Sequence, residues 1–565
     1  MAFDPTNPLI IQSDRSILLE VDNPKFEEAR DFLSRFAEII KSPEYVHTYS
    51  ITPLSLWNAA SAGMTAEEII EGLKKFSKYP VPSNVIRDIK DYISRYGRVK
   101  IIKENDEFYL KCDSEVLADE IWSNKKTRQY LIERIDDITF IFDEGDRGFL
   151  KQALVEIGYP AEDLAGYVEG EYLDIELRKI TRSGKPFELR DYQKEAAEAF
   201  YAGGSVHGGS GVIVLPCGAG KTIVGLAAMA LVKSSTLILA TNLVAVRQWI
   251  SEIIDKTTID PSLVGEYSGE KKEIKPITVV TYQVLTYHSS KDSPFEHLDI
   301  FMARNWGLII YDEVHVLPAP IFRATAKIQA TRRLGLTATL IREDGRESDV
   351  FSLIGPKKFD KPWKTLENQG WIAEAICHEI RVELPDELLR KYAVADDRNK
   401  YRIAAENPEK IKIVKKILEK HKKDNILIIG LYLSQLRQIA KEINAPIITG
   451  KTPQKERLEL FKQFREGKIK VLVVSKVANF AIDLPDANVA IQISGTFGSR
   501  QEEAQRLGRI LRPKEDGSQA HFYSIVTKDT KDMDFAAKRQ LFLTEQGYQY
   551  IIQDPEALFG EVEES

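Results

Sequence analysis

Cysteine is scarce in this chain of 565 residues, which contains only Cys112, Cys217 and Cys377. These three lie far apart and form no C-x-x-C pair, so the sequence predicts no structural disulfide, zinc site or iron–sulfur cluster. Long apolar runs are missing too, since none approaches the roughly 20 residues that span a bilayer. The start, MAFDPTNPLI, lacks the basic and apolar regions of a signal peptide. We therefore expect a protein of the reducing cytoplasm with no membrane contact.

An excess of charge of one sign is also missing. The chain has 78 lysines and arginines against 85 aspartates and glutamates, a net charge of −7. This balance gives no general attraction to nucleic acid, so such binding would depend on local basic patches and helix N-termini. Hydrophobic content of 43% and charged content of 29% are typical of globular proteins and indicate neither disorder nor a fibrous repeat.

Two long stretches of the chain alternate short β-rich runs with helical patterns. The first begins near residue 211 and the second near residue 424, and their candidate strands are GVIVL, TLILATN, ITVVTYQ, WGLIIYDE and RRLGLTAT, then NILIIGLY, APIITG, KIKVLVVSK, NVAIQIS and HFYSIV. Continuous apolar strands separated by helices predict parallel sheets covered on both faces. The predicted fold class is therefore α/β, with two parallel-sheet domains in tandem.

The first 175 residues differ from this pattern. They contain a mostly helical part and then a small mixed part with the candidate strands RVKII, EFYLKC and ITFIF. The length also suits three or four domains of about 150 residues each. We predict a helical domain over 1–95, a small α+β domain over 96–175, α/β domains over 176–358 and 359–545, and a C-terminal tail over 546–565.

The stretch LPCGAGKTIVGLAAM, residues 215–229, ends like a phosphate-binding loop, although Leu215 stands where the full G-x-x-x-x-G-K-[ST] pattern has glycine. Such a loop needs an incoming strand, small residues that let backbone N–H groups converge, and a helix N-terminus facing the anion. Lys221 would reach β and γ phosphates, and the Thr222 hydroxyl would ligate Mg²⁺. A glycine turn with a chance lysine is the alternative. The predicted nucleotide contacts are Cys217, Gly218, Ala219, Gly220, Lys221 and Thr222.

A second pattern, WGLIIYDEVHVLPAP, places Asp312 and Glu313 at the end of a buried strand. The carboxyl ends of parallel strands are where open α/β sheets bind ligands. Asp312 would hold Mg²⁺ through its hydration shell and Glu313 would orient the attacking water. Alone, such a pair is more often a solvated turn; beside a phosphate loop it indicates ATP hydrolysis.

His315 follows this pair and is placed to link the γ-phosphate to the TAT segment, Thr337 to Thr339. A lone histidine in such a position is usually an ordinary core residue. The surrounding motifs favour a coupling role instead.

A third pattern is SRQEEAQRLGRILRP, residues 499–513. At helical spacing, one narrow face carries Gln501, Gln505, Arg509 and Arg512, and the apolar residues lie opposite. The polar face is either simply solvated or inserts its arginines toward a γ-phosphate held by the other domain. Such arginine fingers contribute on the order of 10³ to 10⁵ in rate in other nucleotide hydrolases.

With these residues in place, the chain resembles the superfamily 2 helicases and, within them, the XPB family in its bacterial form. DEVH, LGLTATL and QRLGRILRP are similar to the family's second, third and sixth motifs, and superfamily 2 members commonly lack the first glycine of the phosphate loop. ELRDYQ, residues 188–193, looks like the adenine-recognising segment, which implies that Arg190 and Gln193 contact the base. TNLVAVRQW and VTYQ look like segments that contact a nucleic-acid strand.

The segment LIREDG resembles the RED motif of the XPB family, which implies a role in strand separation for Arg342, Glu343 and Asp344; a plain solvated loop is the alternative. In VSKVANFAIDLPDANVAI, Asp483 matches the helicase pattern, but Ala481 stands where a glycine is usual.

Residues 384–407 look like the family's thumb insertion. They combine basic groups suited to phosphates with aromatic rings suited to bases, namely Arg390, Lys391, Arg398, Lys400 and Arg402 with Tyr392 and Tyr401. By composition alone, this stretch is equally well a surface helix. The resemblance implies contact with DNA.

As a whole, the resemblance implies two RecA-like domains that close on ATP and reopen after hydrolysis. The expected protein is an ATP- and Mg²⁺-dependent DNA translocase and helicase, moving 3′ to 5′ and acting in DNA repair on forked DNA or single-strand/double-strand junctions. We expect a monomer associated with the nucleoid, with a repair nuclease or other repair factor as partner. The alternatives are a double-strand translocase that does not unwind, an RNA-dependent helicase, and a nucleic-acid-binding scaffold that uses ATP only as a conformational ligand.

Overall fold

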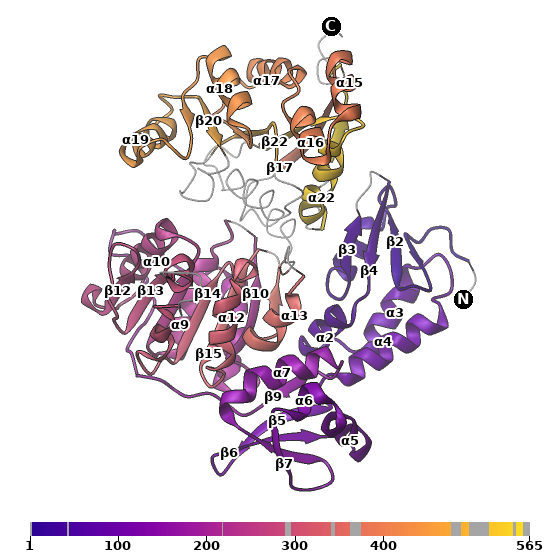
Figure 1. Cartoon of the computed structure of the whole chain (residues 1–565), viewed down its shortest axis with the longest axis vertical. Coiled ribbons are helices and arrows are strands. Elements are labelled where there is room, and N and C mark those ends of the chain that lie inside the picture. Colours follow the sequence, from indigo (N-terminus) through magenta and orange to yellow (C-terminus); the bar gives the residue numbers. More distant parts are fainter. Residues whose placement is uncertain are drawn as a thin grey trace.

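The computed structural model describes residues 3–556 except 42–44, 217, 289–294, 339, 341–344, 362–374, 476–486, 496–518, 546–547 and 549. Two large α/β units and two smaller N-terminal units make up the described chain (Figure 1). In these described residues no helix has the length and apolar character needed to cross a membrane.

The first unit contains a sheet that the sequence did not predict, so the expectation of a helical domain over 1–95 was wrong. Four antiparallel strands in the order β1-β2-β4-β3 accompany four helices. These strands have only three to five residues each, so their alternation of buried and exposed residues is weak beside the helical patterns. The elements are β1 (Leu9–Ile11), β2 (Ser16–Glu20), α1 (Phe26–Leu33), β3 (Glu38–Lys41), β4 (Val46–Ser50), α2 (Pro53–Ser61), α3 (Ala66–Phe76) and α4 (Ser83–Arg95).

The second unit is a small α+β domain, as expected from the sequence. Its five strands have the order β7-β8-β6-β5-β9, antiparallel except for the β5–β9 pair. The three candidate strands correspond to β5, β6 and β8. The elements are β5 (Val99–Glu104), β6 (Glu107–Cys112), α5 (Glu115–Ser123), α6 (Lys125–Arg128), β7 (Leu131–Arg134), β8 (Thr139–Phe142), α7 (Arg147–Glu156) and β9 (Ala161–Asp163).

The first α/β domain is built on a fully parallel seven-stranded sheet in the order β12-β13-β11-β14-β15-β10-β16. The five predicted strands form its centre. Its elements are α8 (Asp191–Tyr201), β10 (Ser210–Val214), α9 (Lys221–Val232), β11 (Thr236–Ala240), α10 (Leu243–Lys256), β12 (Val264–Tyr267), β13 (Ile277–Thr281), α11 (Tyr282–Leu285), β14 (Leu308–Asp312), α12 (Ala319–Ala326), β15 (Arg332–Thr337), α13 (Glu347–Asp349) and β16 (Lys357–Asp360).

The second α/β domain repeats this plan with a parallel sheet in the order β19-β20-β18-β21-β22-β17-β23. Its elements are β17 (Ala375–Val382), α15 (Asp386–Val394), α16 (Asp397–Ala405), α17 (Glu409–Lys420), β18 (Ile426–Gly430), α18 (Leu433–Glu442), β19 (Ile447–Ile448), α19 (Gln454–Arg465), β20 (Val471–Ser475), β21 (Val489–Gln492), β22 (Ala520–Thr527), α22 (Lys531–Glu545) and β23 (Tyr550–Gln553). The prediction of two tandem parallel-sheet domains is confirmed.

Two domain boundaries differ from the prediction because an edge strand crosses each of them. β16 pairs with β10, so the first α/β domain extends past residue 358. β23 pairs with β17, so part of the predicted tail completes the second sheet. Both edge strands have only four residues and are only partly buried, which is why the sequence did not reveal them.

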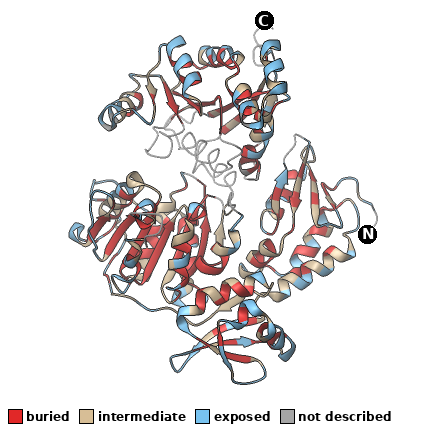
Figure 2. Ribbon diagram, in the orientation of Figure 1, coloured by how far each residue is buried: buried red, intermediate tan, exposed pale blue. Residues whose placement is uncertain are grey.

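The central strands of both large sheets are buried between helical layers, as the red strands in Figure 2 show. In the first domain, α8, α9 and α10 pack on one face of the sheet and α11 and α12 on the other. Each parallel strand therefore delivers the loop at its carboxyl end to one common edge.

The N-terminal unit contacts both α/β domains. Asn58 in α2 accepts a hydrogen bond from the Lys357 backbone N–H of the first domain at 2.9 Å, and the rings of Trp57 and Phe351 lie 6.4 Å apart. From the second domain, Leu541 in α22 is buried in the hydrophobic core of the N-terminal unit. The N-terminal unit is thus packed against both α/β domains.

Candidate active site

Three neighbouring strands bring the predicted catalytic segments to one edge of the first parallel sheet. Val214 at the end of β10 pairs with Thr337 at the end of β15, and Asp312 at the end of β14 pairs with Leu336. The phosphate loop, the DEVH segment and the TAT segment therefore start side by side.

The phosphate loop turns into α9 through two glycines with left-handed backbones, Gly218 at φ 84° and Gly220 at φ 80°. A Cβ on Gly220 would lie 2.6 Å from the Gln193 side-chain nitrogen, so both the dihedral angle and the space favour glycine here. Gly220 caps α9 without a side-chain hydrogen bond. A helix that begins in this way suits an anion as the acceptor for its first N–H groups.

Lys221 and Glu313 face each other at this edge. The Lys221 Nζ atom lies 3.1 Å from Glu313 Oε1, and both side chains are largely withdrawn from solvent. Burial tends to raise the pKa of Glu313, but the Lys221 ammonium, followed by His315, outweighs it and lowers that pKa. Glu313 has a left-handed backbone at φ 51°, an uncommon conformation for a non-glycine residue that occurs preferentially at functional sites.

Asp312 is held in place by two aromatic residues. Trp249 in α10 donates its indole N–H to Asp312 Oδ2 at 3.0 Å, and the Tyr282 hydroxyl donates to the Asp312 backbone carbonyl at 2.7 Å. Burial raises the pKa of Asp312 to about 6, and the neighbouring Glu313 charge adds to this effect. The Trp249 hydrogen bond and Lys221 act in the opposite direction and favour the carboxylate.

His315 connects this carboxylate pair to the TAT segment. Its Nδ1 atom lies 2.7 Å from Thr337 Oγ1 and 3.4 Å from Glu313 Oε2, and its ring is buried. One ring nitrogen thus lies within reach of Glu313 and of the TAT segment, which the sequence expected His315 to link to the γ-phosphate.

The predicted adenine-recognising residues dock on the phosphate loop. Gln193 donates to the Ala219 carbonyl at 3.1 Å, and Arg190 donates to the Tyr192 hydroxyl at 3.0 Å. The Tyr192 hydroxyl in turn donates to the same Ala219 carbonyl at 2.7 Å. The start of α8 and the loop before α9 are therefore joined at one backbone carbonyl.

Several predicted site residues lie outside the described part of the chain. They are Cys217, Thr339, Arg342, Glu343, Asp344, Asp483, Gln505, Arg509 and Arg512, and Ala481 lies outside it as well. The residues that the structure brings together are Gly218, Ala219, Gly220, Lys221, Thr222, Asp312, Glu313, His315 and Thr337, with Arg190 and Gln193 beside them.

The thumb-like insertion forms two helices, α15 and α16, but one expectation about it was wrong. Tyr401 is completely buried, and its hydroxyl donates to the Gly495 carbonyl of the second α/β domain. The Tyr392 hydroxyl accepts a hydrogen bond from the Lys531 N–H at 2.8 Å. Tyr401 has no face exposed for stacking on a base because it packs edge-on against Phe535 at 4.9 Å.

Sequence reasoning missed three residues of the site: Tyr192, Trp249 and Tyr282. Each lies inside a motif that the sequence singled out, in ELRDYQ, TNLVAVRQW and VTYQ. Their partners, Ala219 and Asp312, are 27 to 63 residues away in the sequence. A buried tyrosine or tryptophan usually finds a hydrogen-bond partner, which is the only signal that could have pointed to them.

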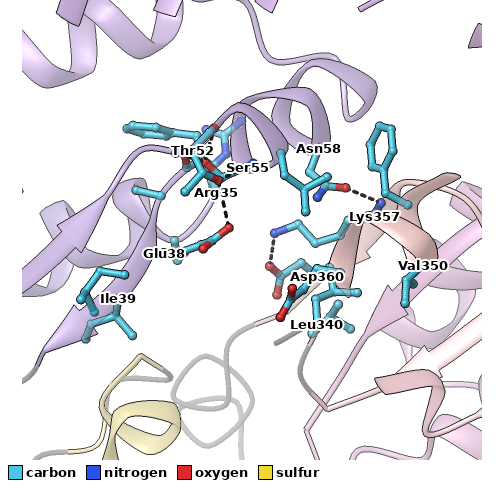
Figure 3. A pocket seen from close by; sticks show the side chains of 18 of the residues that line it. Arg35, Glu38, Ile39, Thr52, Ser55, Asn58, Leu340, Val350, Lys357 and Asp360 are labelled. Atoms are coloured by element: carbon cyan, nitrogen blue, oxygen red, sulfur yellow. Dashed lines mark hydrogen bonds and ion pairs between the residues drawn. The ribbon is translucent and has the colours of Figure 1, made fainter. Parts of the chain in front are cut away.

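A hollow of about 430 Å³ lies next to this site, between the N-terminal unit and the first α/β domain (Figure 3). Its walls include Arg35, Glu38 and Asn58 from the N-terminal unit, and Lys357 and Asp360 from β16. Val214, Ala338 and Leu340 also line it, so it borders the ends of β10 and β15. The two units are joined across it by the Asn58–Lys357 hydrogen bond, and the Lys357–Asp360 ion pair at 2.8 Å lies on its wall.

Comparisons with known proteins match three family models to this chain. A family model described as the ERCC3/RAD25/XPB C-terminal helicase matches residues 366–562. A helicase conserved C-terminal domain model matches residues 9–136, and one for the type III restriction enzyme res subunit matches residues 186–342. Matched segments thus occur in the N-terminal units and in both α/β domains.

The similarity to whole proteins extends over nearly the full chain. DNA 3′-5′ helicase XPB of Mycobacterium tuberculosis is 54% identical over 555 residues, covering 98% of this chain and 99% of that protein. The protein of the same name from Kineococcus radiotolerans is 51% identical, covering 98% of both chains. The general transcription and DNA repair factor IIH helicase/translocase subunit XPB of Enterocytozoon bieneusi is 36% identical, covering 96% of this chain and 92% of that one.

Two RecA-like sheets in tandem, with a phosphate loop and a DEVH segment at the edge of the first, define a helicase of superfamily 2. Sequence identity to full-length relatives then identifies the family within this superfamily. The chain belongs to the XPB family of DNA 3′-5′ helicases.

Proposed function

We propose that this chain is an ATP-dependent DNA 3′-5′ helicase that couples ATP hydrolysis to strand separation in DNA repair. The observation that carries the proposal is the Lys221–Glu313 ion pair at the N-terminus of α9, beside Asp312. A cation, two carboxylates and a helix N-terminus at one sheet edge are the groups that phosphoryl transfer to water requires from a protein.

The residues present fit a nucleotide with Mg²⁺. Gly218 and Gly220 leave room for phosphate oxygens near the backbone, and among the described residues the buried Glu313 Oε2 makes only a long contact of 3.4 Å with His315 Nδ1. Thr222 and Asp312 would hold Mg²⁺, which would neutralise charge on the phosphates. Glu313 would orient the attacking water, Lys221 would move from Glu313 to the phosphates, and Arg190 and Gln193 would contact the base.

The second α/β domain would complete the site. Gln505, Arg509 and Arg512 lie in the part of the chain that matches the XPB C-terminal helicase model, and we assign them to the γ-phosphate side. His315 would report the state of that phosphate to Thr337, the first residue of the TAT segment, which is supported by their 2.7 Å contact. Arg342, Glu343, Asp344 and Asp483 would act on the DNA.

Partner and location are part of the same proposal. Helices α15 and α16 carry Arg390, Lys391 and Arg402 on exposed positions, which suits contact with DNA phosphates at a fork or junction. We propose a cytoplasmic monomer that works at the nucleoid, with a repair nuclease or other repair factor as partner. The Enterocytozoon bieneusi relative carries DNA repair in its name, which supports the assignment to repair.

The first test is steady-state ATPase of the wild type and Lys221→Ala, with no nucleic acid and with single-stranded DNA, forked DNA, duplex DNA and RNA of equal length. Stimulation that is greatest with forks and absent in the variant, together with unwinding of 3′-tailed forks, is the expected result. Stimulation by duplex without unwinding would leave a double-strand translocase, and preference for RNA would reject the DNA assignment.

A second test separates a motor from an ATP-gated scaffold. The Glu313→Gln variant should still bind ATP but lose most of its ATPase activity, because the glutamine carboxamide cannot polarise water as the carboxylate does. A wild type that binds ATP, never hydrolyses it under any condition, and still binds DNA would be a scaffold.

A further inference from the structure

We propose that Trp249 and Tyr282 are positioning residues that fix Asp312 from the two opposite layers of the first domain and make its placement depend on α10 and α11. The proposal rests on the proposed function, because it takes Asp312 as the carboxylate that serves Mg²⁺. Neither residue would touch the nucleotide, so their effect would pass through Asp312.

Trp249 fixes the Asp312 side chain. Its indole N–H is its only donor, and it is directed at Asp312 Oδ2 at 3.0 Å. The ring is 2% exposed and lies directly over α9, where a Cβ on Gly225 would come within 2.4 Å of Trp249 Cη2. The Trp249 ring therefore packs between α9 and the end of β14. Because Trp249 belongs to α10, the rotamer of the Asp312 carboxylate depends on the position of that helix.

Tyr282 fixes the Asp312 backbone. It is the first residue of α11, directly after β13, and it is 5% exposed. Its hydroxyl passes the end of the intervening strand β11 and donates to the Asp312 carbonyl at 2.7 Å. The carbonyl at the end of a parallel strand is otherwise left without a partner in the ladder, so this hydrogen bond sets where the strand stops.

The two aromatic residues belong to different layers. Trp249 packs in the hydrophobic cluster with α8 and α9, and Tyr282 packs in the cluster with α12 on the other face of the sheet. Movement of either helical layer relative to β14 would weaken its hydrogen bond to Asp312, because a hydrogen bond at 3.0 Å weakens steeply when it lengthens by half an ångström or so. Asp312 is thus the point where the two layers meet.

The outer surface of α10 has a cation that a DNA phosphate could recruit. Arg247, two residues before Trp249, is about half exposed and pairs with Glu270 at 2.6 Å and Glu266 at 3.6 Å. Glu270 is well exposed, so a phosphate can compete with it for the guanidinium. A DNA phosphate that binds Arg247 on the outer side of α10 would therefore shift the same helix that carries the Trp249 indole on its inner side.

The test uses Trp249→Phe and Tyr282→Phe, which keep an aromatic ring and remove the hydrogen-bond donor. Trp249→Phe also makes the buried ring smaller, so its control must be another buried Trp→Phe change. The matched controls are Trp306→Phe and Tyr311→Phe. Trp306 is equally buried and donates to the Ile300 carbonyl at 2.8 Å. Tyr311 directly precedes Asp312 in β14, but its hydroxyl meets Thr325 at 2.9 Å, so neither control hydrogen bond involves Asp312. Thermal unfolding of all four variants shows whether each one folds.

Two quantities are measured: the Mg²⁺ concentration for half-maximal binding of a fluorescent ATP analogue, and the fold-stimulation of ATPase by forked DNA. Loss of a hydrogen bond to a charged group predicts that Trp249→Phe needs about tenfold more Mg²⁺ than Trp306→Phe. Tyr282→Phe should lose most of its DNA stimulation, with a smaller change in Mg²⁺ dependence, whereas Tyr311→Phe should match the wild type. The Mg²⁺ titration needs no turnover and is independent of any DNA effect.

Folded variants at Trp249 and Tyr282 that match their controls in both measurements would overturn the proposal. If the wild type itself shows no stimulation by DNA, the proposed function fails and the link to α10 and α11 fails with it. The Mg²⁺ titration would still decide whether Trp249 positions Asp312, so the two failures are distinguishable.

Discussion

The Lys221 ammonium lies 3.1 Å from the Glu313 carboxylate, so the cation predicted to bind phosphate is paired with the carboxylate predicted to activate water. The Lys221 ammonium lowers the pKa of Glu313 and keeps this carboxyl group charged in a site that is largely shielded from solvent. Nucleotide binding must separate this pair, and the pair therefore opposes binding while it prepares both residues for the reaction.

Replacing Glu313 with Gln should accordingly tighten ATP binding while turnover falls. Removing the competing carboxylate should increase affinity by roughly threefold to tenfold, since an ion pair of this kind contributes about 1 kcal/mol. Equilibrium titration with a fluorescent ATP analogue measures the effect. Glu379→Gln is a suitable control, because Glu379 is a buried carboxylate paired with Arg381 at 2.6 Å in the other α/β domain. Weaker binding by Glu313→Gln than by the control would contradict this view of the pair.

Thr337→Val should separate ATP hydrolysis from unwinding. The substitution keeps the shape of the side chain but removes the hydroxyl 2.7 Å from His315 Nδ1. Net loss of one buried hydrogen bond costs about 1 kcal/mol, too little to unfold the domain. We expect the ATPase rate with forked DNA to fall less than the unwinding rate. Thr325→Val removes another buried hydroxyl, bonded to Tyr311, and should lower neither rate; an equal loss in both rates for Thr337→Val would argue against a coupling role.

Gly148→Ala should loosen the small α+β domain from the first α/β domain. Helix α7 crosses the end of α12 so closely that a Cβ at residue 148 would lie 2.3 Å from the Ala326 carbonyl oxygen and 2.6 Å from its Cα. The backbone must move to make room, at a cost of about 1 to 3 kcal/mol. Hydrogen exchange should increase in residues 147–156 and 319–326. Gly269→Ala meets no atom within 4 Å and serves as the control; unchanged exchange in the Gly148 variant would mean that the contact is not essential for docking.

Mild acid should destabilise the second α/β domain through His378. Burial, followed by the neighbouring His521, lowers the pKa of His378 to about 4. The unfolded chain binds a proton near pH 6.5 and the folded domain does not, so stability is fully present above pH 6.5 and falls as the pH drops toward 4. The groups around the ring are His421, His521, Tyr523, Lys420 and Gln553, and Tyr523 stacks on it at 4.4 Å.

The variant His378→Phe keeps the stacked ring and removes the titrating group. Its melting temperature should fall less between pH 7 and pH 5 than that of the wild type, by an amount that corresponds to about 1 to 2 kcal/mol. His207→Phe, at an exposed position, should leave the pH dependence unchanged. Identical pH dependence in the wild type and His378→Phe would show that His378 does not control acid stability.

The centre of each large sheet could be predicted because the information is local. Strands such as Leu308–Asp312 are continuous apolar runs flanked by helical patterns, and burial on both faces produces that signature. The edge strands Lys357–Asp360 and Tyr550–Gln553 have four residues each and are only partly buried, so neither produces the longer apolar run of a central strand. The N-terminal strands escaped prediction because each has at most five residues, which is too short for a clear alternating pattern.

The residues of the candidate site likewise fall into those that local sequence patterns reveal and those that only the fold brings together. Lys221, Asp312 and Glu313 were recognised because each lies in a short pattern that combines a strand end with a specific residue type. Trp249 was not recognised, because its contact with Asp312 joins residues 63 positions apart. Tyr401 was misjudged because composition counts an aromatic ring but does not say which side of a helix packs against Gly495 and Phe535.

The burial of Leu541 in the core of the N-terminal unit has a consequence for biosynthesis. On a ribosome that adds about 5 to 20 residues per second, the first unit emerges tens of seconds before residue 541 is made. Until then, the part of its core that Leu541 covers stays open to water or to a chaperone. The core of the first unit to be translated is therefore completed by α22, which is translated near the end of the chain. A product of interrupted translation would expose the apolar surface that Leu541 otherwise covers.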